Sequence, residues 1–358
     1  MQNEYARRAW AAIQYNKVDI TDSLREYSLT VEYTDELTGK ADDLQLTLDD
    51  PKWLWLTDWF PDKGATVQGQ IITKFWNSTI EAEKMLDMGL FEIDEIEASG
   101  APNTVKIKAV SVPNNTTLRG VVTTKQWEKI TIKQVAEEKA NNAKLKLHYE
   151  TEENPTLDRI EQTEQSDLSF LYKLCTDHGL ALKVTDGTMV IFEEKKLEDA
   201  EPLLCFIRPQ AENVEPIQNK DGVNLRLLEV SSWSFSTSVR DVYKACRVEY
   251  QKGKKKEKIV GTFTDPNKTE GKTLIVKEEV ANQEEAIRKA KKALRDKNKD
   301  EVTVRMQLQG DTDLNSGLTV IVKGFGRFDG KYLITQVRHS VGGAYRCSVS
   351  MRRCINGY

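Results

Sequence analysis

The stretch Ile13–Gly69, IQYNKVDITDSLREYSLTVEYTDELTGKADDLQLTLDDPKWLWLTDWFPDKGATVQG, decides how this chain folds. Within it, apolar or aromatic residues alternate with polar ones at positions 27, 29, 31 and 33, and again at positions 44, 46 and 48. A period of two residues is typical of a half-buried β-strand. A polar segment containing Gly39 separates the two runs, so the stretch predicts two strands joined by a turn.

Three motifs follow one another in this stretch with fixed order and spacing. They are Tyr15–Thr21 (YNKVDIT), Ala41–Asp49 (ADDLQLTLD) and Trp59–Gly64 (WFPDKG). Their succession resembles the opening of the late control gene D family, the tail hub proteins of contractile-tailed bacteriophages and related injection particles. In that family a YNG-x-DIT start, an ADDL strand and a W-x-P-x-x-G turn follow in this order. Lys17 stands where the family has glycine, a departure that affects only a turn.

The composition fits a soluble protein built from many strands. At 358 residues the chain exceeds one ordinary core and predicts about two or three domains. A formal net charge of −4 argues against a general nucleic-acid binder, which needs a basic face. No apolar run approaches the roughly 18 to 20 residues of a membrane helix, and the first residues lack a secretory signal. We therefore expect synthesis and folding in a cytoplasm.

The cysteines support the same compartment. They are odd in number, widely spaced and free of C-x-x-C pairs, which favours small buried thiols over disulfides or metal ligands. The five are Cys175, Cys205, Cys246, Cys347 and Cys354.

Residues 1–112 are expected to form the first β domain. Further strands are predicted at 67–75, 89–96 and 105–110, and short strands at such spacing indicate a barrel or a sandwich. Tryptophans at positions 53, 55 and 59 could form a sugar-binding platform. Aromatic rings in a β domain more often pack under a loop or against a subunit, which is the role we expect for Trp53, Trp55 and Trp59.

Residues 113–204 are expected to form a small α+β connecting domain. Thr131–Gln134 fits a capping box at the start of one helix, and a second helix is predicted from about Ser166. Gly179 is placed to end that helix in a left-handed conformation. Asp186-Gly187 then predicts a tight hairpin. The sequence from the second helix through this hairpin resembles the middle region of the hub family.

Residues 205–358 return to strands and are expected to form a second β-barrel with an inserted helix. Strands are predicted at 242–250, 259–263, 302–308, 318–322, 332–339 and 345–351, and an amphipathic helix at 283–297. The segment 324–337 resembles the closing strands of the hub family's second barrel. The lysine-rich segment 251–258 could contact nucleic acid, although an exposed hairpin tip is the simpler interpretation.

The search for chemistry finds no catalytic, cofactor-binding or metal-binding residues. His148, His178 and His339 lie in different predicted regions and none has metal-ligand spacing. His178 precedes a helix-ending glycine, where a cation would favour the helix dipole. The glycines at 324, 326 and 330 miss the dinucleotide pattern and indicate a turn. Asp42, Asp43, Asp49 and Asp50 could hold a cation, but aspartate is also common at the ends of strands.

The resemblance implies a structural baseplate hub, not an enzyme, in a virion tail or tail-like particle assembled in the bacterial cytoplasm. It implies a homotrimer that adapts the six-fold tail tube to the three-fold spike. The implied partners are the tail tube protein, the spike protein, the tape-measure protein and other baseplate proteins, without specific nucleic acid or membrane anchoring. The alternative is a tail-associated protein that degrades cell walls or binds carbohydrate.

The predicted fold is mainly β, with two similar tail-tube-like β-barrel domains flanking the α+β connecting domain. Residues 1–112 and 205–352 are expected to share one topology, and to form two barrels instead of one continuous sheet. The second copy is expected to carry the larger insertion, because its predicted helix has no clear counterpart in the first.

Overall fold

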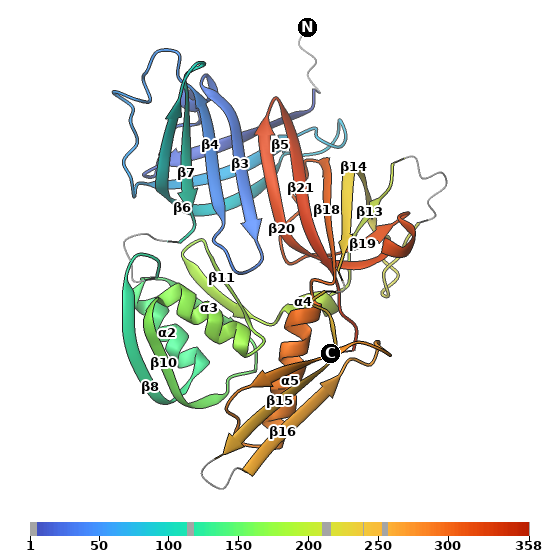
Figure 1. Ribbon diagram of the computed structural model, residues 1–358. Helices are drawn as coiled ribbons and strands as arrows, with labels where there is room; N and C mark the ends of the chain where they lie inside the picture. The colour runs from blue at the N-terminus through green and yellow to red at the C-terminus, as the bar shows by residue number, and fades with distance from the viewer. Residues whose placement is uncertain (1–5, 113–117, 210–215, 239, 253–256, 358) are drawn as a thin grey trace.

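The alternating stretch forms the expected strand pair within a larger curled sheet (Figure 1). The structure is a computed structural model and describes residues 6–112, 118–209, 216–238, 240–252 and 257–357. In β4, every second residue is buried, as the pattern predicts. The first β unit consists of β1 (Arg8–Tyr15), β2 (Val18–Asp19), α1 (Thr21–Arg25), β3 (Ser28–Glu36), β4 (Asp43–Asp49), β5 (Thr66–Lys74), β6 (Lys84–Ser99) and β7 (Thr104–Val110).

The connecting region follows the predicted signals and adds three strands, β8, β9 and β10, and a short helix, α4, that they missed. Thr131 caps α2 through the expected capping box, and Ser166 caps α3. Gly179 ends α3 with φ of 71°, and Asp186-Gly187 form the hairpin turn with both φ angles positive. The elements are β8 (Val122–Thr131), α2 (Ile132–Asn142), β9 (Lys146–Glu150), β10 (Thr156–Ser166), α3 (Asp167–Asp177), β11 (Ala181–Thr185), β12 (Thr188–Phe192) and α4 (Glu194–Asp199).

The second β unit closes on itself. Its strands are hydrogen-bonded in the cyclic order β13-β14-β18-β21-β20-β19, and β19 pairs back with β13. The closing strand β13 is short and runs parallel to both of its neighbours. The elements are β13 (Leu204–Ile207), β14 (Arg226–Thr237), β18 (Val302–Gln309), β19 (Thr319–Lys323), the 3-10 helix η1 (Gly326–Phe328), β20 (Gly330–Gly342) and β21 (Ala344–Arg353).

The larger insertion lies in the second unit, as expected. Between β14 and β18 the chain forms a separate three-stranded sheet packed against a helix. Residues 253–256, at the predicted hairpin tip of the basic segment 251–258, lie outside the described residues, and on either side of them Gln251 and Lys252 pair with Lys258 and Glu257. The insert consists of β15 (Tyr243–Lys252), β16 (Glu257–Thr264), β17 (Lys272–Lys277) and α5 (Gln283–Asn298).

The two β units share one strand order. Each has six principal strands, which are β1, β3, β4, β5, β6 and β7 in the first unit and β13, β14, β18, β19, β20 and β21 in the second. If these are counted in chain order, both sheets run second, third, sixth, fifth, fourth, first. The common topology expected from the sequence is therefore present in the order of the strands.

Two features differ from that expectation. The first unit does not close among the described residues, because β1 pairs with β5 and β2 but not with β3. The expectation of two separate sheets was wrong: β3 pairs with β20, so both units belong to one 13-stranded sheet. Apolar residues from both units also form a single buried cluster. A short-range sequence pattern could not reveal this, because the pairing joins strands about three hundred residues apart.

Candidate functional site

A histidine and a cysteine meet inside the second β unit. His339 and Cys347 are register partners on β20 and β21, and the sulfur lies 3.3 Å from Nδ1 of the imidazole. The imidazole Nε2 donates to the carbonyl of Leu314 at 3.1 Å, which leaves Nδ1 to accept from the hydroxyl of Tyr345 at 2.8 Å. Sequence analysis missed this pair, because only the strand register brings its members together.

This pair lacks the properties of a catalytic dyad. Burial lowers the pKa of His339 to about 4 and raises the pKa of Cys347 to about 12, so both groups are neutral near pH 7. A nucleophilic cysteine requires a thiolate and access to substrate, whereas both side chains are almost completely buried. The pair therefore belongs to the core.

The other two histidines lie apart from it. His148 is exposed, and its Nε2 lies 2.6 Å from a carboxylate oxygen of Glu150. His178 follows the last residue of α3, as predicted, but its expected positive charge was wrong. Burial, together with the nearby Lys292 and Lys289, lowers the pKa of His178 to about 4. A neutral imidazole gives the helix dipole little stabilisation.

The four aspartates of the first β unit have separate roles. Asp42 is buried and accepts the backbone N–H of Glu36 at 2.8 Å, whereas Asp50 is buried at the other end of β4 and accepts the backbone N–H of Trp55 at 3.3 Å. Asp43 and Asp49 are half-buried strand residues. Within the described parts of the chain, no group of three or more His, Cys, Asp or Glu side chains has metal-binding geometry.

A buried ion cluster joins the three parts of the molecule. The ammonium group of Lys183 on β11 pairs with Asp35 on β3 and lies 3.4 Å from Asp42. It also donates to the hydroxyl of Ser316 at 3.3 Å, and Asp35 accepts the backbone N–H of Ser316 at 2.6 Å. Burial raises the pKa of Asp42 to about 6. Each ion is paired, which is the condition for burying charge at moderate cost.

The tryptophan cluster is divided between core and surface. Trp55 is buried, and its ring makes edge contacts with Tyr27 and Trp59, the latter at 5.5 Å between centroids. Trp59 and Trp53 are 43% and 55% exposed. The predicted packing role thus holds for Trp55, while the other two rings remain partly available on the loop surface.

Beneath this loop lies an apolar cavity of about 540 Å³. Ile13, Leu24 and Leu46 line both this cavity and a second one of about 680 Å³ on the side of β1 and the β20–β21 turn. Both cavities open from the interior of the curled sheet, which the first unit fails to close. The lining of the first includes Ile13, Tyr15, Ile20, Leu24, Leu46, Trp55, Trp59, Phe60, Pro61, Val67, Ile93 and Ile107.

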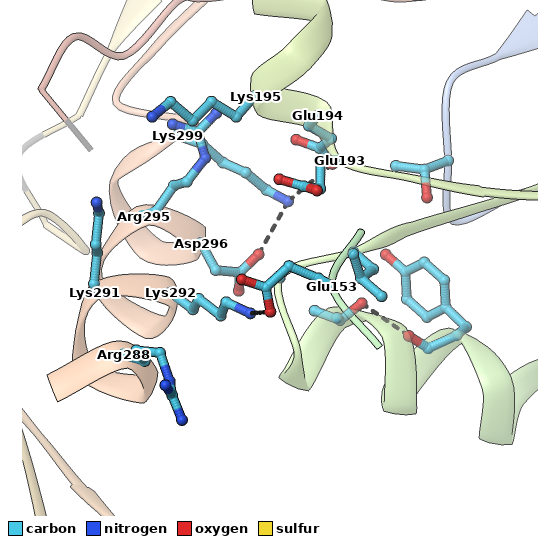
Figure 2. Close-up of a pocket in the computed structure, with 15 residues that line it drawn as sticks. Glu153, Glu193, Glu194, Lys195, Arg288, Lys291, Lys292, Arg295, Asp296 and Lys299 are labelled. Atoms are coloured by element: carbon cyan, nitrogen blue, oxygen red, sulfur yellow. Dashed lines mark hydrogen bonds and ion pairs between the residues drawn. The ribbon is translucent and has the colours of Figure 1, made fainter. Parts of the chain in front are cut away.

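A charged cleft of about 400 Å³ lies between α5 of the insert and the connecting domain (Figure 2). Lys292 reaches Glu153 at 3.2 Å, and Lys299 pairs with Asp296 at 3.0 Å and with Glu194 at 3.5 Å. These pairs join the inserted helix to the loop after β9 and to α4. The basic residues that line the cleft are Lys195, Arg288, Lys291, Lys292, Arg295 and Lys299.

This cleft holds carboxylates, the groups that a cell-wall hydrolase would need, and Glu194 is one of them. A glycosidase keeps one carboxyl group protonated through a raised pKa. Partial burial raises the pKa of Glu194, but the charges of Lys299 and Arg352 outweigh it and leave the pKa below its ordinary value. Glu194 is therefore ionised near neutral pH and serves as an ion-pair partner.

Within the large sheet, two of the strands, β14 and β6, each have a stretch of edge beside which no described strand lies. On β14, residues 230–237 pair with β18 on one side, whereas β13 covers only residues 226–229 on the other. On β6, residues 95–99 pair with β7, whereas β5 covers only residues 84–92. Unpaired backbone groups at an edge are suited to pairing with another chain. Figure 1 shows the two edges at opposite ends of the upper layer.

These features define a β-rich assembly protein: two linked β units, ion-paired junctions and unpaired sheet edges. No helix in the described part of the chain is long and apolar enough to cross a bilayer.

Comparison with known proteins gives the family. The sequence profile of the phage tail baseplate hub (GPD) family matches residues 93–344. The chain therefore belongs to this family. It is also 26% identical over 182 residues to the probable baseplate hub protein of Escherichia phage 186, a match that covers 50% of this chain and 43% of that protein.

The fold occurs in solved tail proteins. The 43 kDa tail protein of prophage MuSo2 from Shewanella oneidensis superposes with a TM-score of 0.68 at 14% identity, covering 96% of this chain and 98% of that one. An Escherichia coli component of the type VI secretion system, described as similar to bacteriophage T4 tail proteins gp27 and gp5, gives a TM-score of 0.54 at 12% identity, covering 99% and 78%. The fold is thus shared by tail and secretion proteins of widely different sequence.

Proposed function

We propose that this chain is a structural, non-enzymatic hub of a tail baseplate and assembles as a homotrimer. We divide it into a first hub domain at 1–112, a connecting domain at 113–204 and a second hub domain at 205–358. The observation that carries the proposal is the repeated strand order of the two β units, combined with membership of the baseplate hub family.

The repeat explains how a hub changes symmetry. A tube ring with six subunits must be continued by a spike with three, and closed rings constrain each interface. A chain with two units of equal strand order presents six units when three copies surround one axis. The β3–β20 pairing already places the two units of one chain edge to edge.

The proposed partners follow from this position. The tail tube protein would contact the six units on one side of the ring, and the spike protein would bind on the other side. The tape-measure protein and other baseplate proteins complete the set, in a virion tail or tail-like particle assembled in the host cytoplasm. The role requires no specific nucleic acid and no membrane anchor.

Light scattering tests the trimer. The full-length chain is measured at several concentrations, alone and with the tube and spike proteins of its own tail. We expect an assembly that contains three copies of the chain in at least one of these samples. Such a trimer should bury more than about 2,000 Å² of surface in total, as permanent assemblies do. A strict monomer under every condition would contradict the proposal.

Zymography on purified cell walls tests the non-enzymatic part. We expect no clearing, because His339 and Cys347 are buried and Glu194 is ion-paired. Clearing that disappears on substitution of one carboxylate or cysteine would identify a hydrolase instead. If that variant still assembles, cell-wall hydrolysis and assembly are separate properties of the chain.

A further inference from the structure

The inserted helix α5 presents a basic stripe to the charged cleft. Its buried stripe consists of Ala286, Ala290 and Leu294, which belong to the apolar cluster of the insert. The basic residues follow a helical spacing of i, i+3, i+4, i+7 and i+11, which places them on one common face. They all line the cleft, and they are Arg288, Lys291, Lys292, Arg295 and Lys299.

The carboxylates that line the same cleft are already engaged within the chain. Each of the four has a cationic or hydroxyl partner among the described residues. These contacts join Glu153 to Lys292, Asp296 to Lys299, Glu194 to Arg352, and Glu193 to the hydroxyl of Thr151. The lining carboxylates therefore do not neutralise the remaining cations of the cleft.

Three cations of the cleft have no ion-pair partner in the part of the chain that the structure describes. They are Lys195 of α4 and Arg288 and Lys291 of α5. The ammonium group of Lys291 lies 5.7 Å from the ring centroid of Phe263, a contact that leaves its charge without a counterion. Lys195 and Arg288 are exposed, and Lys291 is half-buried. The cleft is thus locally positive in a chain whose formal net charge is −4.

The basic stripe lies directly against the end of α3. A Cβ built on Gly179 would lie 3.0 Å from Cδ of Lys292, so the missing side chain leaves the space through which this lysine reaches Glu153. The positive charge also acts on the preceding residue. Burial, and after it the charges of Lys292 and Lys289, lower the pKa of His178.

The cleft suits an acidic peptide better than a chain of phosphates. Its volume of about 400 Å³ falls within the range of ligand pockets, which is about 300–1,000 Å³. Phosphates along a nucleic acid would meet the four lining carboxylates as well as the cations, and Tyr172 is the one aromatic lining residue on which a base could stack. A peptide can direct its carboxylates to the basic stripe and its backbone N–H groups to the acidic side.

The length of the stripe matches a short extended segment. Arg288 and Lys299 are eleven residues apart, which corresponds to about 16 Å along the helix axis. About five residues of an extended peptide cover that distance. Figure 2 shows Arg288 at one end of the cleft and Lys195 at the other, so the unpaired cations are spread along this path.

We propose that this cleft is a docking site for an acidic peptide segment of another protein, which lies along α5 and pairs with Arg288, Lys291 and Lys195. Its carboxylates supply the counterions that these three cations lack, through charge-assisted hydrogen bonds. In Figure 1 the insert and the connecting domain lie below the large sheet. The site therefore goes beyond the proposed function and does not depend on how the β units of different copies associate.

Fluorescence anisotropy with a labelled hexaglutamate peptide tests the site. The full-length chain is titrated with this probe at low and at high ionic strength. We expect binding that weakens at high ionic strength, because exposed charges are screened by salt. Labelled hexaglutamine, which has the same length and no charge, should not bind.

Substitution of the unpaired cations locates the binding. Arg288→Gln, Lys291→Gln and Lys195→Gln should each weaken hexaglutamate binding roughly two- to fivefold, the range of an exposed ion pair, and the triple variant roughly tenfold or more. None of the three makes an ion pair with a described residue, so thermal unfolding should stay unchanged. The matched control is Lys297→Gln, which removes the same charge from an exposed position of α5 outside the cleft and should leave the affinity unchanged.

The imidazole NMR signals at neutral pH give a second readout. Hexaglutamate should shift the signal of His178, which adjoins the cleft residue Gly179, and should leave that of the buried His339 in place. The variant His178→Gln assigns the signal.

Labelled single-stranded DNA and unlabelled pyrophosphate separate the other occupants. If either binds as tightly as hexaglutamate through the same three cations, the cleft is a general anion site and the peptide assignment is overturned. If hexaglutamate does not bind, or binds the triple variant as tightly as the wild type, the docking site is overturned. Both results leave the hub proposal intact, since light scattering tests that proposal separately.

Discussion

The two β units have the same strand order but differ in how their sheets end. The second unit closes through its first strand, β13, which is four residues long and runs parallel to both neighbours. The first strand of the first unit, β1, is eight residues long and antiparallel to β5, and it does not reach β3. Strand order alone therefore does not determine closure, and the two first strands differ in both direction and length.

The gap in the first unit is where the second unit attaches. β20 extends along β3 as far as Gly342, where an added methyl group would lie 2.3 Å from the carbonyl oxygen of Leu29. The edge that β1 would need is thus occupied by β20. The first unit leaves its own ring open and gains a continuous sheet with its neighbour, while α1 covers part of the opening with Leu24.

The largest expected difference between the units is in core truncation. Leu308→Ala in the closed barrel should lower the free energy of unfolding by about 4 kcal/mol, since the packed surroundings cannot relax. Leu46→Ala in the first unit should cost only about 2 kcal/mol, because Leu46 already borders both cavities. Urea titrations of both variants measure these values. Equal losses would show that the first unit is packed as tightly as the second.

A smaller difference is expected when a methyl group is added. A Cβ on Gly310 would lie 2.2 Å from the ring of Tyr345, which is held by His339, so Gly310→Ala should cost about 2–3 kcal/mol. A Cβ on Gly69 would meet the terminal methyl of Met88 at 2.3 Å. That flexible side chain can move, so Gly69→Ala should cost less than about 1 kcal/mol. If thermal unfolding shows a larger loss of stability for Gly69→Ala than for Gly310→Ala, the second unit is not the more rigid of the two.

The sequence predicted the units better than their connection. Alternation in β4, the capping box at Thr131 and the Asp186-Gly187 turn each act within a few residues, and each was found where expected. In β3 the expected alternation fails at Leu29, which lies beside a bulge and is 46% exposed. The resemblance to the hub family supplied the repeat. These signals are local, so they are readable without knowing how distant strands meet.

What could not be predicted depends on distant pairing. β13 reads LCFI, a short buried run without alternation, and the β8–β10 pair is largely polar. The meeting of His339 with Cys347 follows from strand register, and the unpaired stretches of β14 and β6 follow from where neighbouring strands stop. None of these features produces a periodic pattern of apolar residues in the sequence.

Acidification should lower the free energy of unfolding by about 2 kcal/mol through His339, a residue of the second unit. The pKa of His339, lowered by burial to about 4, lies below its unfolded value, so the unfolded chain binds the proton first as the pH falls from 7. Stability is then lost between about pH 6.5 and 4, and the wild type should lose about 2 kcal/mol more than His339→Gln between pH 7 and 5.

Asp42 at the junction with the first unit should act in the opposite direction. Its pKa is raised by burial to about 6, above the unfolded value, so the folded chain takes up a proton first between pH 6 and 4. Protonation there favours folding, and Asp42→Asn should remove this gain on acidification. Urea titrations at pH 7, 6 and 5 on both variants measure the two effects. Parallel curves for wild type and both variants would refute the assignments.

The smallest expected effect tests the cavity of the first unit directly. Ser23 of α1 lines the 540 Å³ cavity, so Ser23→Leu should bury an apolar side chain there and raise the free energy of unfolding by about 1 kcal/mol. The matched control is Asp22→Leu, one residue earlier, where the side chain is 97% exposed and the new leucine would remain in water. The midpoint temperature of thermal unfolding should rise for Ser23→Leu and stay level or fall slightly for Asp22→Leu. Because the closed barrel has no unpaired first strand, a gain of this kind is specific to the open unit. If the two variants unfold at the same temperature, the cavity beneath the tryptophan loop is already filled. The first unit would then be packed as tightly as the second at this end of the sheet.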